Sequence, residues 1–205
     1  MTFLQHNHVS LRQLSHKMLA FLVSVLLVFV LAAPFAPATT ALAENTSSNK
    51  SSVTDEPKLT EATTAIVTDA QGNVLWSKNP DQELPMASIT KVMTAIVALD
   101  SGVNLDEPCE ITVPDLEEGS QVAGLTSDDT PTLRQLIMMM LVYSANDAAY
   151  NIAVNVSGSQ QAFVDQMNKK AAEIGMTHTQ FQNPHGLDAD GHYSTARDLA
   201  LMGRY

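Results

Sequence analysis

The scarcity of β-structure limits what this chain can fold into more than any other feature of its sequence. Residues 65–68 and 74–77 are short β-prone runs, and the turn cluster 69–73 separates them. This pattern predicts a hairpin, because Gly72 allows the positive φ that a tight turn needs. A two-stranded ribbon alone is only marginally stable in water, so we expect residues beyond 205 to complete a larger antiparallel sheet.

Helical periodicity dominates the chain after this hairpin. Residues 89–100 have the spacing of a helix with a wide buried face. Its apolar stripe consists of Val92, Ile96 and Leu99, with Met93 and Val97 broadening it.

Four more helices are expected, over residues 133–142, 148–156 and 160–174 and from about residue 195 onward. Thr130 is expected to cap the first of these, with Pro131 as its first helical residue. Thr195 is expected to cap the last, with Asp198 as its capping partner.

The first 43 residues have the composition of a secretory signal peptide. Arg12 and Lys17 precede the apolar run 18–33, no acidic residue occurs, and Ala43 ends a small-x-small cleavage site. We therefore expect export to the cell envelope or beyond. An uncleaved membrane anchor is the alternative, since the run falls just short of the roughly 17 to 25 residues that span a bilayer.

The rest of the chain divides into a tether and one domain. Residues 44–60 are polar and are predicted to be a flexible tether, and residues 61–205 are predicted to form the domain. The chain has 22 acidic against 11 basic residues and a net charge of −11, so nucleic acid is not expected as a partner. Cys109 is the only cysteine, which excludes an intramolecular disulfide, and it is expected to be a small structural residue.

Ser88 and Lys91 lie one helical turn apart, on one face, at the start of the predicted helix 89–100. A serine hydroxyl needs a base, and a lysine can be that base only when burial lowers its pKa. The neighbours expected to bury Lys91 are Ile89, Val92 and Met93. The pair therefore predicts a nucleophile, Ser88, and its base, Lys91.

A Ser-x-x-Lys pair is by itself a weak signal, because serine and lysine are common. The chain contains a second such pair, Ser47 and Lys50, which also matches Ser-x-Asn. That pair lies in the polar tether, where no packing could bury the lysine, so context separates the two.

A short segment separates the predicted helices 133–142 and 148–156, and it contains Ser144, Ala145, Asn146 and Asp147. Ser144 and Asp147 fit a capping box, an interpretation that needs no function. Beside Ser88 and Lys91, a second interpretation applies: the Ser144 hydroxyl would relay a proton, and the Asn146 amide would hold a substrate amide.

Four stretches in order, between residues 65 and 205, resemble the low-molecular-weight penicillin-binding D-alanyl-D-alanine carboxypeptidases. They are residues 85–95 (PMASITKVMTA), 144–149 (SANDAA), 181–187 (FQNPHGL) and 192–199 (HYSTARDL). The resemblance implies an α/β (α+β) fold like that of penicillin-recognising serine hydrolases and β-lactamases, in which an antiparallel sheet lies beside a helical subdomain.

The resemblance also implies a chemistry. Ser88 attacks the penultimate D-alanine of a peptidoglycan stem peptide ending in D-Ala-D-Ala, and Lys91 takes its proton. Ser144 relays protons and Asn146 binds the substrate backbone. β-Lactams are implied as inhibitors, neither cofactor nor metal is needed, and family members often associate with the membrane through a C-terminal amphipathic anchor.

One family motif is absent: no Lys-Thr-Gly or close variant occurs in the 205 residues. In the family this motif binds the terminal carboxylate of the substrate, and its strand supplies an oxyanion donor. We therefore expect the chain to be C-terminally truncated and weakly active as it stands.

Three other interpretations make different demands on the sequence. A class A β-lactamase would need a glutamate four residues before an asparagine, and no glutamate here has that spacing. A metallopeptidase would use three histidines and an aspartate in spacings that match no compact zinc motif; these residues are His178, His185 and His192 with Asp188 or Asp190. A non-catalytic exported fragment or penicillin-binding module stays open as the alternative of a different class.

Overall fold

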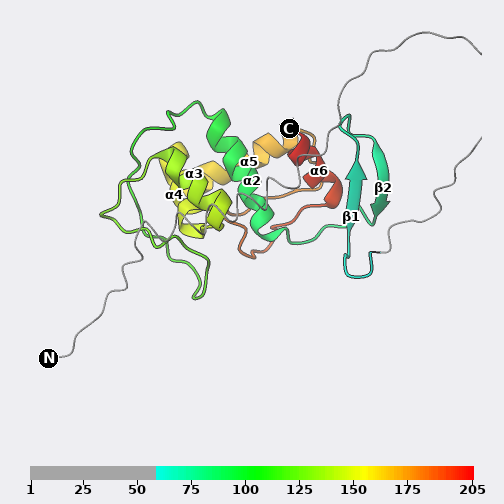
Figure 1. The fold of residues 1–205 in the computed structure, drawn as a ribbon, viewed down its shortest axis with the longest axis horizontal. Coiled ribbons are helices and arrows are strands. Elements are labelled where there is room, and N and C mark those ends of the chain that lie inside the picture. The colour runs from blue at the N-terminus through cyan, green and yellow to red at the C-terminus, as the bar shows by residue number, and fades with distance from the viewer. Residues whose placement is uncertain (1–58) are drawn as a thin grey trace, which may run out of the picture. The chain divides into compact units, whose positions relative to one another are not determined.

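The computed structural model describes residues 59–205 (Figure 1). The predicted signal peptide, and all but the last two residues of the predicted tether, lie outside the described residues. None of the helices in the described part has the length and hydropathy needed to cross a membrane.

The predicted hairpin is confirmed. β1 (Ala65–Thr68) and β2 (Val74–Lys78) pair in antiparallel fashion, and they are the two strands of the only sheet within residues 59–205. Gly72 has a φ of 90° in the connecting turn. The Asp69 carboxylate closes this turn by accepting hydrogen bonds from the backbone N–H groups of Gln71 and Asn73.

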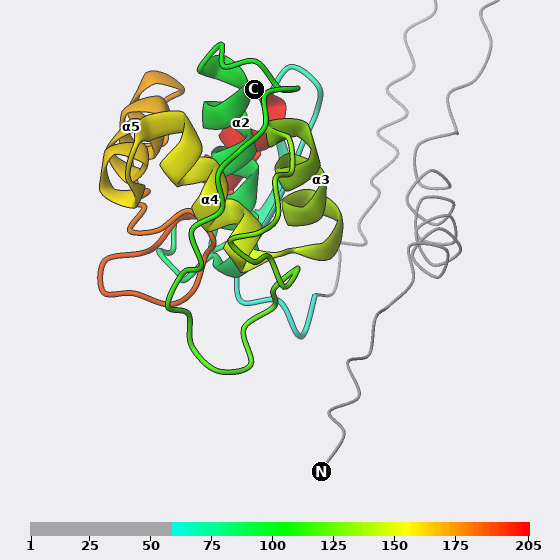
Figure 2. The same ribbon diagram turned by 90° about the vertical axis from the view of Figure 1, so that its left-hand side faces the viewer.

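The predicted helices are also present, and none of their ends is shifted by more than two residues. They are α2 (Thr90–Asp100), α3 (Leu133–Tyr143), α4 (Asn146–Ser157), α5 (Gln160–Glu173) and α6 (Ala196–Arg204). A short 3-10 turn, η1 (Ala87–Ile89), leads into α2. α2 packs against all four of the other helices, and α6 also contacts β1 (Figures 1 and 2).

The predicted N-cap of α3 was wrong, although the helix begins at residue 133 as expected. Thr132, and not Thr130, is its N-cap: the Thr132 hydroxyl accepts a hydrogen bond from the Gln135 N–H, and the Gln135 side chain accepts one from the Thr132 N–H. This reciprocal capping box satisfies two backbone donors that would otherwise lack partners. Pro131 lies before the helix, where its carbonyl accepts a hydrogen bond from the Cys109 N–H.

The predicted buried stripe of α2 was also partly wrong. Met93 and Val97 are buried, but Val92 and Leu99 are 38% and 54% exposed. Three polar residues are buried instead, namely Thr90, Lys91 and Thr94. Each has a hydrogen-bonding partner from a distant segment, which offsets the cost of removing a polar group from water.

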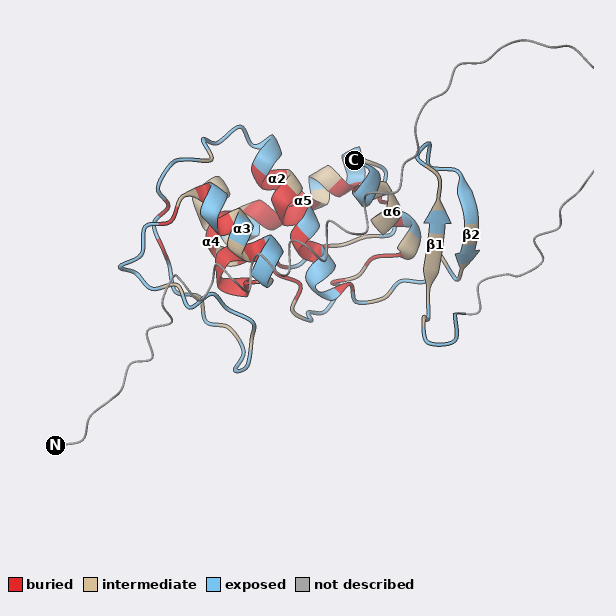
Figure 3. Cartoon of the chain, viewed as in Figure 1, coloured by how far each residue is buried: buried red, intermediate tan, exposed pale blue. Residues whose placement is uncertain are grey.

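The helices enclose one apolar core. It lies among the buried segments of the helices, which are red in Figure 3. Its fully buried side chains include Met93, Leu136, Met140, Ile152 and Phe163. Cys109 is buried as well, and burial raises the pKa of its thiol, as expected of a structural cysteine.

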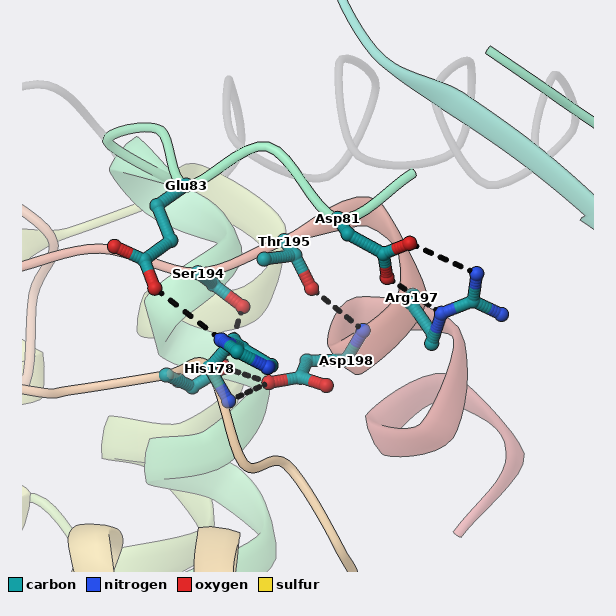
Figure 4. A network of polar contacts seen from close by, with 8 residues as sticks. Asp81, Glu83, His178, Ser194, Thr195, Arg197 and Asp198 are labelled. Carbon is teal, nitrogen blue, oxygen red and sulfur yellow. Dashed lines mark hydrogen bonds and ion pairs between the residues drawn. The ribbon is translucent and has the colours of Figure 1, made fainter. Parts of the chain in front are cut away.

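A polar network links the start of α6 to the segment that follows α5 (Figure 4). The Thr195 hydroxyl caps the helix by accepting a hydrogen bond from the Asp198 N–H, which confirms the predicted pair. The Asp198 carboxylate in turn accepts hydrogen bonds from the His178 N–H and the Thr179 hydroxyl, both at 2.8 Å. The chain after α5 is thereby anchored to α6.

The helical core allows a direct test on one helix. In the full-length gene product, Leu136→Ala is expected to lower the free energy of unfolding by about 2 to 5 kcal/mol, because it leaves a cavity in the core. Leu141→Ala, on the exposed face of the same helix, is expected to change it by less than about 0.5 kcal/mol. Urea unfolding measures both, and equal effects would contradict the orientation of α3.

Candidate active site

Ser88 lies at the surface, in the turn that leads into α2. The preceding residue, Ala87, has a φ of 48°, a left-handed conformation that residues other than glycine rarely adopt. Such a conformation persists only where the surrounding structure enforces it. The turn places the exposed Ser88 just before the helix and Lys91 in the first helical turn.

Lys91 is buried, with 3% of its surface exposed, and it is bound on two sides. Its Nζ donates a hydrogen bond to Ser88 Oγ at 3.0 Å and another to the backbone carbonyl of His185 at 2.5 Å. Burial lowers the pKa of Lys91 from 10.5 to about 8. A useful fraction of the side chain is therefore neutral near physiological pH.

Lys91 is buried as predicted, but two of the residues expected to bury it are themselves partly exposed. Ile89 is 47% exposed and Val92 is 38% exposed, whereas Met93 is fully buried. Besides Ser88, the group that contacts the Lys91 amine is a backbone carbonyl of the loop at residues 183–187, more than ninety residues away in sequence.

Ser144 completes a chain of three polar groups. It is the C-cap of α3, with a left-handed φ of 61°, and its Oγ donates a hydrogen bond to Ser88 Oγ at 3.1 Å. The alternative capping box with Asp147 does not form, because Ala145 is the N-cap of α4. The structure thus brings the predicted residues Ser88, Lys91 and Ser144 together.

Asn146 is the first residue of α4, beside Ser144, and is 5% exposed. Its backbone N–H donates to the Gln121 carbonyl at 2.7 Å. Asp147 fixes the same loop, because its carboxylate accepts hydrogen bonds from three successive backbone N–H groups, those of Ala123, Gly124 and Leu125. Among the described residues, the Asn146 side chain makes no hydrogen bond to Ser88, Lys91 or Ser144.

The three histidines of the metallopeptidase interpretation have separate structural partners. His178 faces Glu83, and the His185 Nδ1 accepts a hydrogen bond from the Leu187 N–H. His192 bonds to the Thr90 hydroxyl at 2.8 Å. No cluster of three metal-ligating side chains occurs between residues 59 and 205, so the described part of the chain offers this interpretation no geometric support.

A cavity of about 320 Å³ lies beside His185. Its lining includes three carboxylates, from Asp115, Glu117 and Asp188. Burial lowers the pKa of the His185 ring to about 4, so this histidine is neutral at physiological pH. The carboxylates favour a neutral or cationic group in the cavity over an anionic one.

Sequence comparison agrees with the motifs. Residues 38–205 match the peptidase S11 family, described as D-alanyl-D-alanine carboxypeptidase. The D-alanyl-D-alanine carboxypeptidase DacF of Bacillus subtilis is 33% identical over 187 residues, which cover 89% of this chain and 46% of that protein. A D-alanyl-D-alanine endopeptidase of Pseudomonas aeruginosa is 43% identical over 143 residues, covering 67% of this chain and 45% of that protein. The chain thus spans about half the length of these relatives.

Solved structures agree with the expected fold. The D-alanyl-D-alanine carboxypeptidase of Mycobacterium tuberculosis is 38% identical, with a TM-score of 0.65 over 70% of this chain and 55% of its own. Penicillin-binding protein D2 of Listeria monocytogenes, solved with cefotaxime bound, is 32% identical, with a TM-score of 0.63 over 70% of this chain and 60% of its own. With Ser88 in contact with both Lys91 and Ser144, the chain belongs to the D-alanyl-D-alanine carboxypeptidase family, peptidase S11.

Proposed function

We propose that the protein is a serine-type D-alanyl-D-alanine carboxypeptidase, which removes the terminal D-alanine from peptidoglycan stem peptides through an acyl-enzyme. The observation that carries this proposal is the contact chain from the buried Lys91 amine to Ser88 Oγ, at 3.0 Å, and from Ser88 Oγ to Ser144 Oγ, at 3.1 Å. Cell wall metabolism is the process in which such a reaction belongs.

Acylation begins with neutral Lys91. In that state the contact with Ser88 reverses, and the serine hydroxyl donates to Nζ instead of accepting from it. Ser88 Oγ then attacks the carbonyl carbon of the penultimate D-alanine while its proton passes to Lys91. The backbone N–H of Ser88 is proposed to stabilise the oxyanion that forms on the attacked carbonyl.

Collapse of this intermediate breaks the peptide bond. The leaving amine of the terminal D-alanine needs a proton, and Ser144 supplies the relay because its hydroxyl contacts Ser88 Oγ. Water then attacks the ester carbonyl, with the same groups accepting its proton, and releases the shortened peptide and free Ser88. Asn146, beside Ser144 at the start of α4, binds the substrate backbone in this proposal.

β-Lactams are proposed to acylate Ser88 by the same first step. The Listeria relative has been solved in cefotaxime-bound and ampicillin-bound forms, which supports this extension. A non-catalytic penicillin-binding module would share the acylation but not the release of D-alanine, so the two activities have to be measured separately.

The place of action is proposed to be the cell envelope. The basic residues Arg12 and Lys17, the apolar run 18–33 and the small residues before position 44 support export through a cleaved signal. Membrane association of the mature protein is part of the same proposal, because members of the family that the chain resembles often carry a C-terminal amphipathic anchor.

An endopeptidase is the second candidate. The relative from Pseudomonas aeruginosa, at 43% identity, is named a D-alanyl-D-alanine endopeptidase. Ser88 and Lys91 would perform the same acyl transfer, and only the leaving group would differ. Incubation with a linear pentapeptide and with a cross-linked dimer separates the two activities. Release of D-alanine from the pentapeptide, without cleavage of the dimer, identifies a carboxypeptidase.

Two substitutions test the catalytic pair in the full-length gene product. Ser88→Ala is expected to abolish labelling by a fluorescent penicillin and release of D-alanine, because no other described hydroxyl contacts a buried amine. Lys91→Arg is expected to be nearly as damaging, since a guanidinium stays protonated and cannot accept the serine proton. Ser101→Ala, at the far end of α2, serves as the control and should leave both activities intact. Substantial activity in either variant of the pair would overturn the assignment.

The pH dependence tests the role of Lys91. Its pKa lies near 8, so the rate of Ser88 acylation is expected to rise with pH through that value as the neutral amine accumulates. The second-order rate of penicillin labelling, followed across the neutral and alkaline range, measures this limb. A rate that is constant over that range would contradict a lysine base.

A further inference from the structure

We propose that Asn183 is a positioning residue for acylation: its side chain fixes the turn at residues 183–187, and this turn sets the places of Lys91 and Ser88 together. Asn183 does not contact the reacting atoms. The inference rests on the proposed function, because the role that it assigns is exerted through the catalytic pair.

The Asn183 side chain is buried, at 6% exposure, and makes three hydrogen bonds to the backbone of its own turn. Its Oδ1 accepts from the Gly186 N–H at 2.6 Å and from the His185 N–H at 3.3 Å. Its Nδ2 donates to the Leu187 carbonyl at 2.8 Å. One side chain thereby bonds to three of the four residues that follow it and closes the turn.

The closed turn presents two successive carbonyl groups to α2. The His185 carbonyl accepts from Lys91 Nζ at 2.5 Å, and the Pro184 carbonyl accepts from the Thr94 hydroxyl at 2.6 Å. Lys91 and Thr94 are three residues apart and so lie on one face of the helix. The turn therefore binds the N-terminal part of α2, which carries Lys91 and Thr94, through two hydrogen bonds.

The same turn also packs closely against the backbone just before Ser88. Gly186 has a φ of 89°, and a Cβ atom at this position would lie 2.0 Å from the Ala87 carbonyl oxygen and 3.0 Å from Thr90 Oγ1. Only glycine leaves room for this approach. Ala87 itself has the rare φ of 48°, and a packed neighbour is what such a conformation requires.

An amide is the side chain that suits this place. It offers an acceptor to two N–H groups and a donor to one carbonyl. Aspartate in place of Asn183 would keep the acceptor but set an oxygen against the Leu187 carbonyl. Alanine would lose all three bonds and leave buried backbone groups without partners.

A loosened turn has a predictable effect on Lys91, whose pKa is lowered by burial. Water entering beside the amine would raise that pKa toward its ordinary value. The ionisable groups on the segments around Lys91 are the His185 ring on the turn, the His192 ring behind Thr90, and Asp147 on α4. Burial lowers the pKa values of both histidines, so at neutral pH neither ring adds a charge that would offset this change.

The test compares three variants of the full-length gene product. Asn183→Ala is expected to slow penicillin labelling at neutral pH by roughly ten- to a hundredfold, because small displacements of a catalytic group cost that much. It is also expected to move the rising limb of the pH profile to higher pH. Asn183→Ser, which adds no charge and keeps an oxygen that can accept from the backbone of the turn, should move the limb in the same direction by less, and it decides the matter if the alanine variant fails to fold.

Asn168→Ala is the matched control. Asn168 also uses its side-chain amide to bind backbone, accepting from the Phe181 N–H at 2.8 Å and donating to the Phe181 carbonyl at 3.0 Å, but it does not touch the turn. Its variant is expected to lose stability and keep the wild-type pH limb.

An unchanged limb in folded Asn183 variants, with wild-type labelling intact, would overturn the positioning role and leave the proposed function standing. Wild-type protein that shows neither labelling nor D-alanine release would overturn the proposed function first, and the inference with it.

Discussion

The burial of one amine, that of Lys91, is the constraint on which the rest of this site depends. A lysine is costly to remove from water in its charged form, and the cost appears here as a pKa lowered to about 8. Two acceptors, the Ser88 hydroxyl and the His185 carbonyl, keep the buried amine from being left without partners. The first acceptor is the proposed nucleophile, and the second belongs to a turn that is distant in sequence. The contacts of the buried amine therefore also hold the nucleophile beside it.

The fold buries Lys91 by placing α2 at the centre of the helices. α2 packs against every other α-helix of the described chain, and its first turn carries Lys91. The residues around the polar cluster are locally unfavourable: Ala87 and Ser144 both have positive φ angles without being glycine. Two such residues next to Ser88 Oγ mean that the packing of the helical core holds the site in a geometry that the isolated segments would not adopt.

Local signals were sufficient for much of this structure. The hairpin follows from the Gly72 turn between two β-prone runs, and the Thr195 cap of α6 follows from its spacing to Asp198. Ser88, Lys91 and Ser144 were singled out because motif and resemblance agree, and the structure brings Ser88 into contact with the other two. The partners of α2 were not predictable, since Thr90 and Thr94 are buried only because His192 and Pro184 approach from about ninety to a hundred residues away. Periodicity assigns polar residues to the exposed face, and tertiary partners reversed that assignment here. The turn composition of residues 183–186 was visible, but the groups that this turn would touch were not.

The most direct test of the account is the ionisation of Lys91 itself. Full-length gene product carrying lysine labelled with carbon-13 at Cε can be titrated by NMR, and the Lys91→Arg variant identifies the resonance of Lys91. The account predicts a midpoint near 8, separated from those of the exposed lysines. A midpoint at the ordinary value of 10.5 would mean that the amine is charged throughout the physiological range, and it would contradict the assignment of Lys91 as the base that activates Ser88.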